Sequence, residues 1–208
     1  MARLLLASRG IPGLAGLLRA RGDRALLVPT ASSPLREPEI AAEVEAELGA
    51  AGLVVERLDL DAATPEAVRE QVAAADVLAV SGGDPFHLLA AARRTGFGSA
   101  ARAALDGGAV YVGLSAGAMV AGPTLEPLRL TSPFAPPPWL DLAGLRLSAV
   151  LVLPHHDRPG RAERNAAAVA AYGDRHRIEP LRDGDVLVDD GGRVELRPGP
   201  SSRPGPRG

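Results

Sequence analysis

Short hydrophobic runs alternate with longer amphipathic segments along the first 120 residues. The runs are continuous, as is typical of strands buried on both faces of a parallel sheet. We expect strands at residues 4–7, 25–29, 53–58, 77–80 and 110–114. Segments with helical periodicity lie at residues 37–50, 65–75 and 85–94. This alternation predicts an α/β fold with a doubly wound, mostly parallel sheet flanked by helices.

The pattern changes after residue 123. A proline-rich loop at 132–139 precedes a strand-like run at 145–153, a helix at 161–172 and two strands at 185–188 and 193–196. Residues 189–192, Asp-Asp-Gly-Gly, suit a hairpin turn between the last two strands. Residues 197–208 are mostly Pro, Gly, Ser and Arg and can bury little apolar area. We therefore expect a single domain over residues 1–196 and a disordered tail over 197–208.

Composition narrows the classes of function. The 208 residues include 23 Lys and Arg against 25 Asp and Glu. The chain therefore has no excess of positive charge that would attract nucleic acid or an anionic membrane. The absence of cysteine excludes disulfides, thiolate metal sites and a cysteine nucleophile. The start of the chain does not resemble a signal peptide, and no run of 18 apolar residues occurs. We expect a cytoplasmic protein that binds a small polar substrate or a protein partner, with no nucleic-acid or membrane partner.

Residues 109–120, AVYVGLSAGAMV, carry the clearest candidate for catalysis. A β-branched hydrophobic run ends at GLSAG, and small residues follow in a helix-compatible pattern. This is the form of a nucleophile elbow, which places a serine, here Ser115, on a tight turn between a strand and a helix. Such a turn directs the N–H of Ala116 toward the position of a substrate oxyanion. The plain structural alternative is a Gly/Ala-rich connection in which the serine has no role.

A second segment whose backbone could bind an oxyanion lies at residues 80–85, Val-Ser-Gly-Gly-Asp-Pro. Gly82 and Gly83 follow a predicted strand and would present N–H groups toward a developing negative charge. A phosphate-binding loop is the weaker interpretation, because the further Gly and the Lys-Ser/Thr pair of such loops are absent.

A serine nucleophile needs a base, and the chain has four histidines. His155 and His156 follow a buried-type strand, which would deliver them to the carboxyl end of the sheet, where doubly wound folds bind ligands. His87 has apolar neighbours in a predicted helix, and His176 lies among charges in a connector. The His-His-Asp run ending at Asp157 could also ligate a metal. We expect no metal and no cofactor, because neighbours on an extended segment point to opposite sides and no second ligand cluster is present.

The acid that would orient the histidine stays open among several residues. Asp183 precedes a glycine at a strand-to-turn position late in the chain, although most such aspartates are simply solvated. The candidates are Asp141, Asp157, Asp183 and Asp185, with Glu126 as an outsider.

Three separated segments, SGGDPFHLL, GLSAGAMV and LPHHDRPGRAERN, together resemble the aspartyl dipeptidase (peptidase E) family of serine peptidases, which includes the cyanophycinases. The resemblance extends from about residue 3 to residue 196. That family has a fold similar to the class I glutamine amidotransferases, with serine in place of their cysteine. The resemblance implies a triad of Ser115 as nucleophile, His155 as general base and Asp183 as the orienting acid. It implies oxyanion donors from Ala116 and from Gly83 or its neighbour Gly82.

Arginines that follow the histidine in the family would bind the substrate. Arg158, Arg161 and Arg164 fall in this segment, where a guanidinium can hold a carboxylate bidentately. The implied reaction is hydrolysis of short peptides through an acyl-enzyme, first of all dipeptides with N-terminal Asp. Leu153 before Pro-His and a short loop between His155 and Arg161 depart from the family pattern. A cyanophycinase-like or other peptidase specificity is therefore the alternative.

Two further alternatives concern the class of protein. An α/β-hydrolase also carries GxSxG, but its acid precedes its histidine; a triad with Asp141 would leave the late strands without a role. A non-catalytic ligand-binding protein on the amidotransferase-like fold is the alternative outside enzymes. The expected partner is a small peptide, and a homodimer is kept as an alternative to the monomer.

Overall fold

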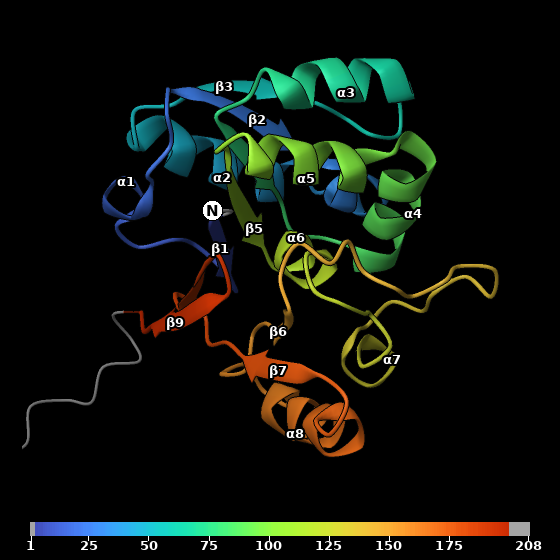
Figure 1. Ribbon diagram of the computed structural model, residues 1–208. Helices are drawn as coiled ribbons and strands as arrows, with labels where there is room; N and C mark the ends of the chain where they lie inside the picture. The colour runs from blue at the N-terminus through green and yellow to red at the C-terminus, as the bar shows by residue number, and fades with distance from the viewer. Residues whose placement is uncertain (1–2, 200–208) are drawn as a thin grey trace, which may run out of the picture.

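The computed structural model describes residues 3–199, which form a seven-stranded central sheet with helices on both faces (Figure 1). The sheet order is β3-β2-β4-β5-β1-β8-β9. Its strands are β1 (Arg3–Ala7), β2 (Arg24–Val28), β3 (Val54–Arg57), β4 (Val77–Val80), β5 (Val110–Leu114), β8 (Val186–Asp190) and β9 (Arg193–Arg197). Strands β1 to β5 run parallel, whereas β8 is antiparallel to β1 and β9 is antiparallel to β8. The predicted α/β class and mostly parallel sheet are confirmed.

Helices cover the two faces of this sheet. The helical segments are α1 (Leu14–Leu17), the 3₁₀ helix η1 (Thr30–Leu35), α2 (Pro38–Ala50), α3 (Pro65–Ala73), α4 (Pro85–Thr95), α5 (Phe97–Asp106), α6 (Ala116–Val120), α7 (Leu128–Thr131) and α8 (Arg161–Tyr172). Helices α1 and α2 pack with one core cluster, and α3, α4, α5 and α6 pack with the other.

Alternation along each strand divides the core between the two faces. In β1, Leu4 and Leu6 belong to one cluster and Leu5 and Ala7 to the other. Successive strand side chains point to opposite faces, so a continuous hydrophobic run can fill both layers. This is the physical reason why the unbroken runs predicted the central strands.

Capping side chains fix two of the predicted helix starts. The Thr64 hydroxyl accepts from the Ala67 N–H at 3.2 Å, ahead of α3. The Asp84 carboxylate accepts from the N–H groups of Phe86 and His87 at 2.8 and 3.3 Å, ahead of α4. Helix α5 has no counterpart in the prediction.

The strand-like run at 145–153 differs from expectation. Only β6 (Val150–Leu153) is a strand, and it pairs in parallel with β7 (Arg177–Pro180) in a separate two-stranded sheet. The edge of β1 that a further strand would need is occupied by β8. Residues 145, 147 and 148 instead donate their N–H groups to the carbonyls of Val120 and Ala121. Figure 1 shows β6, β7 and α8 gathered at one end of the molecule.

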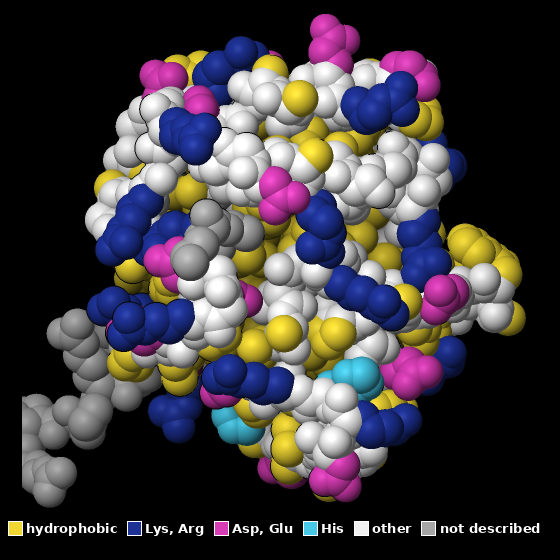
Figure 2. Space-filling view, viewed as in Figure 1, with side chains coloured by type: hydrophobic (Ala, Val, Ile, Leu, Met, Phe, Trp, Pro, Cys, Tyr) yellow, Lys and Arg dark blue, Asp and Glu magenta, His cyan; other side chains and the backbone are white. Residues whose placement is uncertain are grey.

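The proline-rich loop at 132–139 projects from the body of the protein (Figure 1). Figure 2 shows hydrophobic side chains on this projection, and Trp139 there is 74% exposed. Over residues 3–199, no helix is long and apolar enough to cross a membrane.

The start of the expected tail needs correction. Arg197 ends β9 and pairs with Val186, and the Gly199 N–H donates to the Asp185 carboxylate at 2.9 Å. Ordered backbone therefore continues past residue 197, because the ladder of the last hairpin and this carboxylate supply its partners. Residues 200–208, the rest of that tail, lie outside the described residues.

The carboxyl ends of three neighbouring strands bring distant segments together. Ser81, Gly82 and Gly83 follow β4, Ser115 follows β5, and Ser8 follows β1. Because β4, β5 and β1 are adjacent and parallel, these residues lie at one edge of the sheet.

A buried tyrosine ties β5 to the helix that follows the elbow. The Tyr111 hydroxyl donates to the Gly117 carbonyl at 2.7 Å, and its side chain is fully buried. We expect Tyr111→Phe to lower the free energy of unfolding by about 1–2 kcal/mol, because a buried carbonyl loses its donor. Urea unfolding measures the change. Tyr172→Phe, at a partly exposed ring on α8, is the matched control and should change it little; equal losses in the two variants would contradict this account.

Candidate active site

The turn between β5 and α6 holds Ser115 in a strained conformation. Ser115 has φ 48° and ψ −107°, a region that L side chains rarely adopt. Its N–H donates to the Ala7 carbonyl at 2.9 Å. A Cβ at Gly117 would overlap the Val80 carbonyl, and a Cβ at Gly113 would overlap the carbonyl of Gly117. The glycines of the GLSAG segment therefore allow the chain to close around the serine.

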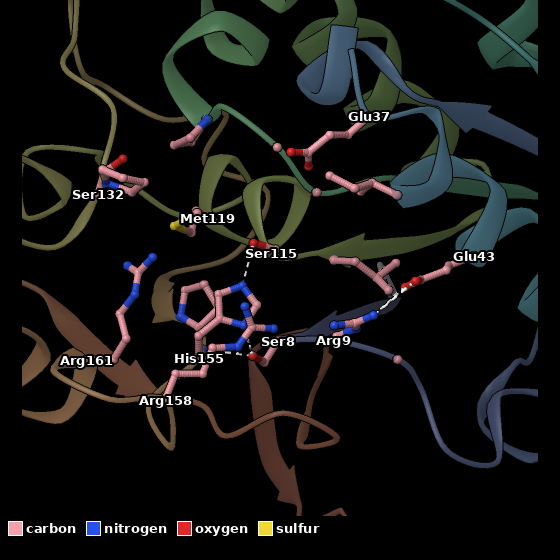
Figure 3. Close-up of a pocket in the computed structure, with 18 of the residues that line it drawn as sticks. Ser8, Arg9, Glu37, Glu43, Ser115, Met119, Ser132, His155, Arg158 and Arg161 are labelled. Atoms are coloured by element: carbon pink, nitrogen blue, oxygen red, sulfur yellow. Dashed lines mark hydrogen bonds and ion pairs between the residues drawn. The ribbon is translucent and has the colours of Figure 1, made fainter. Parts of the chain in front are cut away.

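Ser115, His155 and Asp183 lie in a hydrogen-bonded row. Ser115 Oγ is 3.1 Å from His155 Nε2, and His155 Nδ1 is 2.7 Å from Asp183 Oδ1. The close-up in Figure 3 draws the contact between the serine and the imidazole. The imidazole is largely buried, with 13% of its side chain exposed.

The small β6-β7 sheet carries the base and the acid. His155 follows β6 and Pro154, and Asp183 lies in the turn between β7 and β8. The Leu181 N–H donates to the Leu153 carbonyl, and the His156 N–H donates to the Leu181 carbonyl. These bonds hold the ends of the two strands together. The histidine thus reaches the edge of the main sheet from a strand that is not part of it.

Asp183 receives more donors than the imidazole alone. Ser8 Oγ donates to Oδ1 at 2.7 Å, and Arg158 donates to Oδ2 through Nε and Nη2 at 2.9 and 2.7 Å. Burial raises the pKa of Asp183, but the hydrogen bonds from Ser8, His155 and Arg158 outweigh it and leave the pKa below its ordinary value. The carboxylate is therefore ionised at neutral pH.

Burial lowers the pKa of His155 below its ordinary value. The hydrogen bond to Asp183 opposes this shift, whereas the positive charges of Arg158 and Arg161 add to it. The imidazole is therefore neutral at pH 7. With Nδ1–H directed at Asp183, the lone pair of Nε2 faces the serine hydroxyl, which is the state that a general base requires.

Ser115 and His155 line a cavity of about 430 Å³, and Asp183 lies behind the imidazole. Figure 3 shows Arg158 and Arg161 on one side of the cavity and Glu37 and Glu43 on the other. Two more acids of α2 and the loop that follows α7 also contribute to the lining; these residues are Glu39, Glu47, Ser132, Pro133 and Phe134. The cavity has the size of a small-molecule site and carries charges of both signs.

The arginines expected to bind substrate have different places. Arg161 lines the cavity, and its Nη1 donates to the Thr131 carbonyl at 2.6 Å. Arg158 also lines it but is held by Asp183. Arg164 donates to the Gly160 carbonyl at 2.8 Å and is not part of the lining.

Of the other residues considered from the sequence, some line the cavity and others lie away from it. Gly82 and Gly83 line the cavity, and a Cβ at Gly83 would overlap the Ala31 carbonyl. Asp141 ion-pairs with Arg93, and His87 Nε2 lies 2.8 Å from Asp61 Oδ2. His156 lines a separate surface depression together with Asp157. Within residues 3–199, no three His, Asp or Glu side chains are grouped as a metal site would need.

Sequence reasoning missed Ser8 and the glutamates of α2. Ser8 directly follows the hydrophobic run of β1, so the edge argument that identified the segments after β4 and β5 could have found it. The glutamates have no such signal, since charged residues on a helix usually face solvent.

Comparisons with known proteins identify the family of the chain. The model of peptidase family S51 matches residues 10–197. A peptidase E of Citrobacter koseri is 33% identical over 154 residues, covering 70% of this chain and 65% of that protein. An uncharacterised peptidase of Listeria monocytogenes is 26% identical over 178 residues, covering 84% and 85%.

Solved structures share the fold. A Listeria monocytogenes protein provisionally named peptidase E superimposes with a TM-score of 0.84 at 23% identity, covering 95% of this chain and 98% of that one. A peptidase from an acI-B1 Actinobacterium gives a TM-score of 0.70 at 21% identity, covering 96% and 95%.

The fold and the family match define the chain as a hydrolase of peptide bonds. It belongs to peptidase family S51, the peptidase E family.

The buried imidazole should titrate at an unusually low pH. We expect the His155 ring to protonate with a midpoint below 6.5, because burial and two arginines disfavour the charged form. Histidine Cε1–H resonances followed by NMR against pH measure it, and a His155→Gln variant assigns the signal. A midpoint at or above 6.5 would contradict the electrostatics described here.

Proposed function

We propose that this chain is a serine peptidase that hydrolyses short peptides, first of all dipeptides with N-terminal Asp. The observation that carries the proposal is the hydrogen-bonded row of Ser115, His155 and Asp183 at the wall of a charged cavity. A neutral base on the hydroxyl and an ionised acid behind the base are the arrangement that makes serine a nucleophile.

Each chemical step has a residue to perform it. His155 Nε2 takes the Ser115 proton as Oγ attacks the peptide carbonyl carbon. The imidazolium, stabilised by Asp183, then gives that proton to the leaving amine, and an acyl-enzyme remains. Water repeats the sequence: His155 removes its proton, the ester carbon is attacked, and the proton returns to Ser115 as the acid leaves.

The oxyanion of both tetrahedral intermediates needs N–H donors. Ala116 is the first residue of α6, and the first N–H groups of a helix have no partner within it. Gly82 and Gly83 follow the neighbouring strand and also line the cavity. We assign the oxyanion hole to the N–H of Ala116 together with that of Gly82 or Gly83.

The charges of the cavity support a short peptide as substrate. Arg161 offers a guanidinium to a carboxylate on one side. Glu37 lies on the other side, where an α-ammonium group would be attracted, and Glu43 there is paired with Arg9. A dipeptide with N-terminal Asp carries both kinds of charge close together. Of the three arginines that follow the histidine, Arg164 lies outside the lining and Arg158 is held by Asp183, so Arg161 is the one proposed to bind a substrate carboxylate.

Removal of either member of the proton-transfer pair should abolish turnover. We expect Ser115→Ala and His155→Ala each to reduce kcat by about 10⁴-fold or more, since triad members act as one unit. His156→Ala is the matched control and should change kcat little, because its ring lies outside the cavity. Dipeptide hydrolysis gives kcat, and a fluorophosphonate probe reports whether Ser115 is activated. A wild-type protein that neither cleaves dipeptides nor reacts with the probe would indicate the non-catalytic alternative.

Substrate preference should depend on the guanidinium of Arg161. We expect Arg161→Lys to lower kcat/KM for Asp-X dipeptides by about 100-fold, because an ammonium cannot replace a two-pronged contact. Dipeptides with a neutral first residue should be affected little. Arg164→Lys, one turn along the same helix, is the control. Full activity of Arg161→Lys on Asp-X, or no wild-type preference for acidic residues, would contradict the aspartyl specificity and leave the serine mechanism standing.

A further inference from the structure

Ser8 is a buried serine that belongs to none of the motifs of the chain. It follows β1 directly, and only 1% of the residue is exposed. Its hydroxyl nevertheless contacts two residues of the row, which are 147 and 175 positions away along the chain.

The hydrogen-bonding roles of the Ser8 hydroxyl are fixed by its partners. The His155 N–H donates to Ser8 Oγ at 2.8 Å, so this oxygen accepts there. The ionised Asp183 carboxylate can only accept, so the single hydroxyl proton goes to Oδ1 at 2.7 Å. Oγ also lies 3.2 Å from His155 Nδ1, where its remaining lone pair can accept. Both neighbours of Nδ1, Ser8 Oγ and Asp183 Oδ1, are therefore acceptors. This favours a proton on Nδ1 and leaves the lone pair of Nε2 for the Ser115 hydroxyl.

The main chain at His155 also depends on this hydroxyl. His155 has φ 62°, a left-handed conformation that is unfavourable for a residue with a side chain. The preceding Pro154 has no N–H, so the His155 N–H is the first donor after β6. Its acceptor is Ser8 Oγ. The bond therefore holds the turn that brings the imidazole to the serine.

The end of β1 is connected to the nucleophile as well. The Ala7 carbonyl accepts the Ser115 N–H at 2.9 Å, and Ser8 is the next residue. Strand β1 lies between β5 and β8 with its core side chains fully buried, so its end is a rigid reference point. Two adjacent residues thus fix the nucleophile on one side and the base and acid on the other.

We propose that Ser8 is a positioning residue of the catalytic row. Its hydroxyl couples the backbone of His155 to the carboxylate of Asp183 and so holds Nε2 in line with Ser115 Oγ. This inference rests on the proposed serine-peptidase function, but it concerns a residue that neither transfers a proton nor touches the scissile bond.

The kinetic test compares four variants. Ser8→Ala removes the hydroxyl, and Ser8→Thr and Ser8→Val form an isosteric pair with and without it. Ser148→Ala is the control, because Ser148 is buried, accepts the Val150 N–H at 3.1 Å and donates to Asp189 at 2.7 Å outside the cavity. It therefore makes the same two kinds of bond without touching the row.

We expect Ser8→Ala to lower kcat by about 10- to 100-fold with little change in KM, because a small misplacement of a reacting group has this effect. Ser8→Thr should retain far more activity than Ser8→Val. Ser148→Ala should lose stability and keep wild-type kinetics. Wild-type kcat in Ser8→Ala, or equal losses in the Thr and Val variants, would overturn the proposal; the second comparison decides if Ser8→Ala does not fold.

An NMR measurement tests the role of Ser8 without relying on peptidase activity. The Nδ1–H resonance of His155, hydrogen-bonded to Asp183, should be visible by NMR in the wild type, in Ser8→Thr and in Ser148→Ala. It should broaden or disappear through solvent exchange in Ser8→Ala and Ser8→Val. A wild type without peptidase activity or probe labelling would contradict the proposed function, and this resonance would still decide the role of Ser8. An unchanged resonance in Ser8→Ala and Ser8→Val would overturn that role.

Discussion

The close approach of α6 to β4 at Gly117 is the constraint on which the site depends. No side chain fits at this position, because a Cβ would overlap the Val80 carbonyl. The Gly117 N–H donates to the Ser81 carbonyl at 3.2 Å, and its own carbonyl accepts the buried Tyr111 hydroxyl. The helix is thereby held against the ends of β4 and β5. This contact, together with the Ser115 N–H bond to the Ala7 carbonyl, holds Ser115 in its strained conformation at the edge of the sheet.

The second constraint is the charge state of Asp183 and His155, which are both partly buried. Burial alone would raise the pKa of Asp183, yet three donors keep the carboxylate ionised. The same surroundings keep His155 neutral, because burial and the nearby guanidinium groups oppose its protonation. Arg158 contributes to both effects, since it is bound to Asp183 and lies close enough to the imidazole to repel a positive charge. Arg158 thus lowers the pKa of both residues, which favours the charged form of Asp183 and the neutral form of His155.

The cavity is formed by the ends of buried strands on one side and by helix and loop residues on the others. Its reactive wall rests on the ends of β1, β4 and β5, which are buried and paired on both sides. Its other walls come from α2 and the segment after His155, which are charged, and from the loop after α7, which is uncharged. Rigid strands suit the proton-transfer geometry, whereas helix and loop positions can change side chains without disturbing the sheet. Changes of specificity within this fold are therefore expected in those walls.

The sequence by itself determined the α/β class, the elbow at Ser115 and the limits of several elements. The strands at 77–80 and 110–114 and the helix at 161–172 agree with the structure residue for residue, because hydrophobic runs and helical periodicity are local properties. Residue patterns left five acids open, and resemblance to a family pointed to Asp183 among them. Tertiary structure decided that this carboxylate meets His155, that β6 lies outside the main sheet, that Arg158 is held by Asp183, and that Ser8 joins the row. These outcomes depend on which loops face one another across 25 to 175 residues of chain, and no local pattern of hydrophobic and polar positions contains that information.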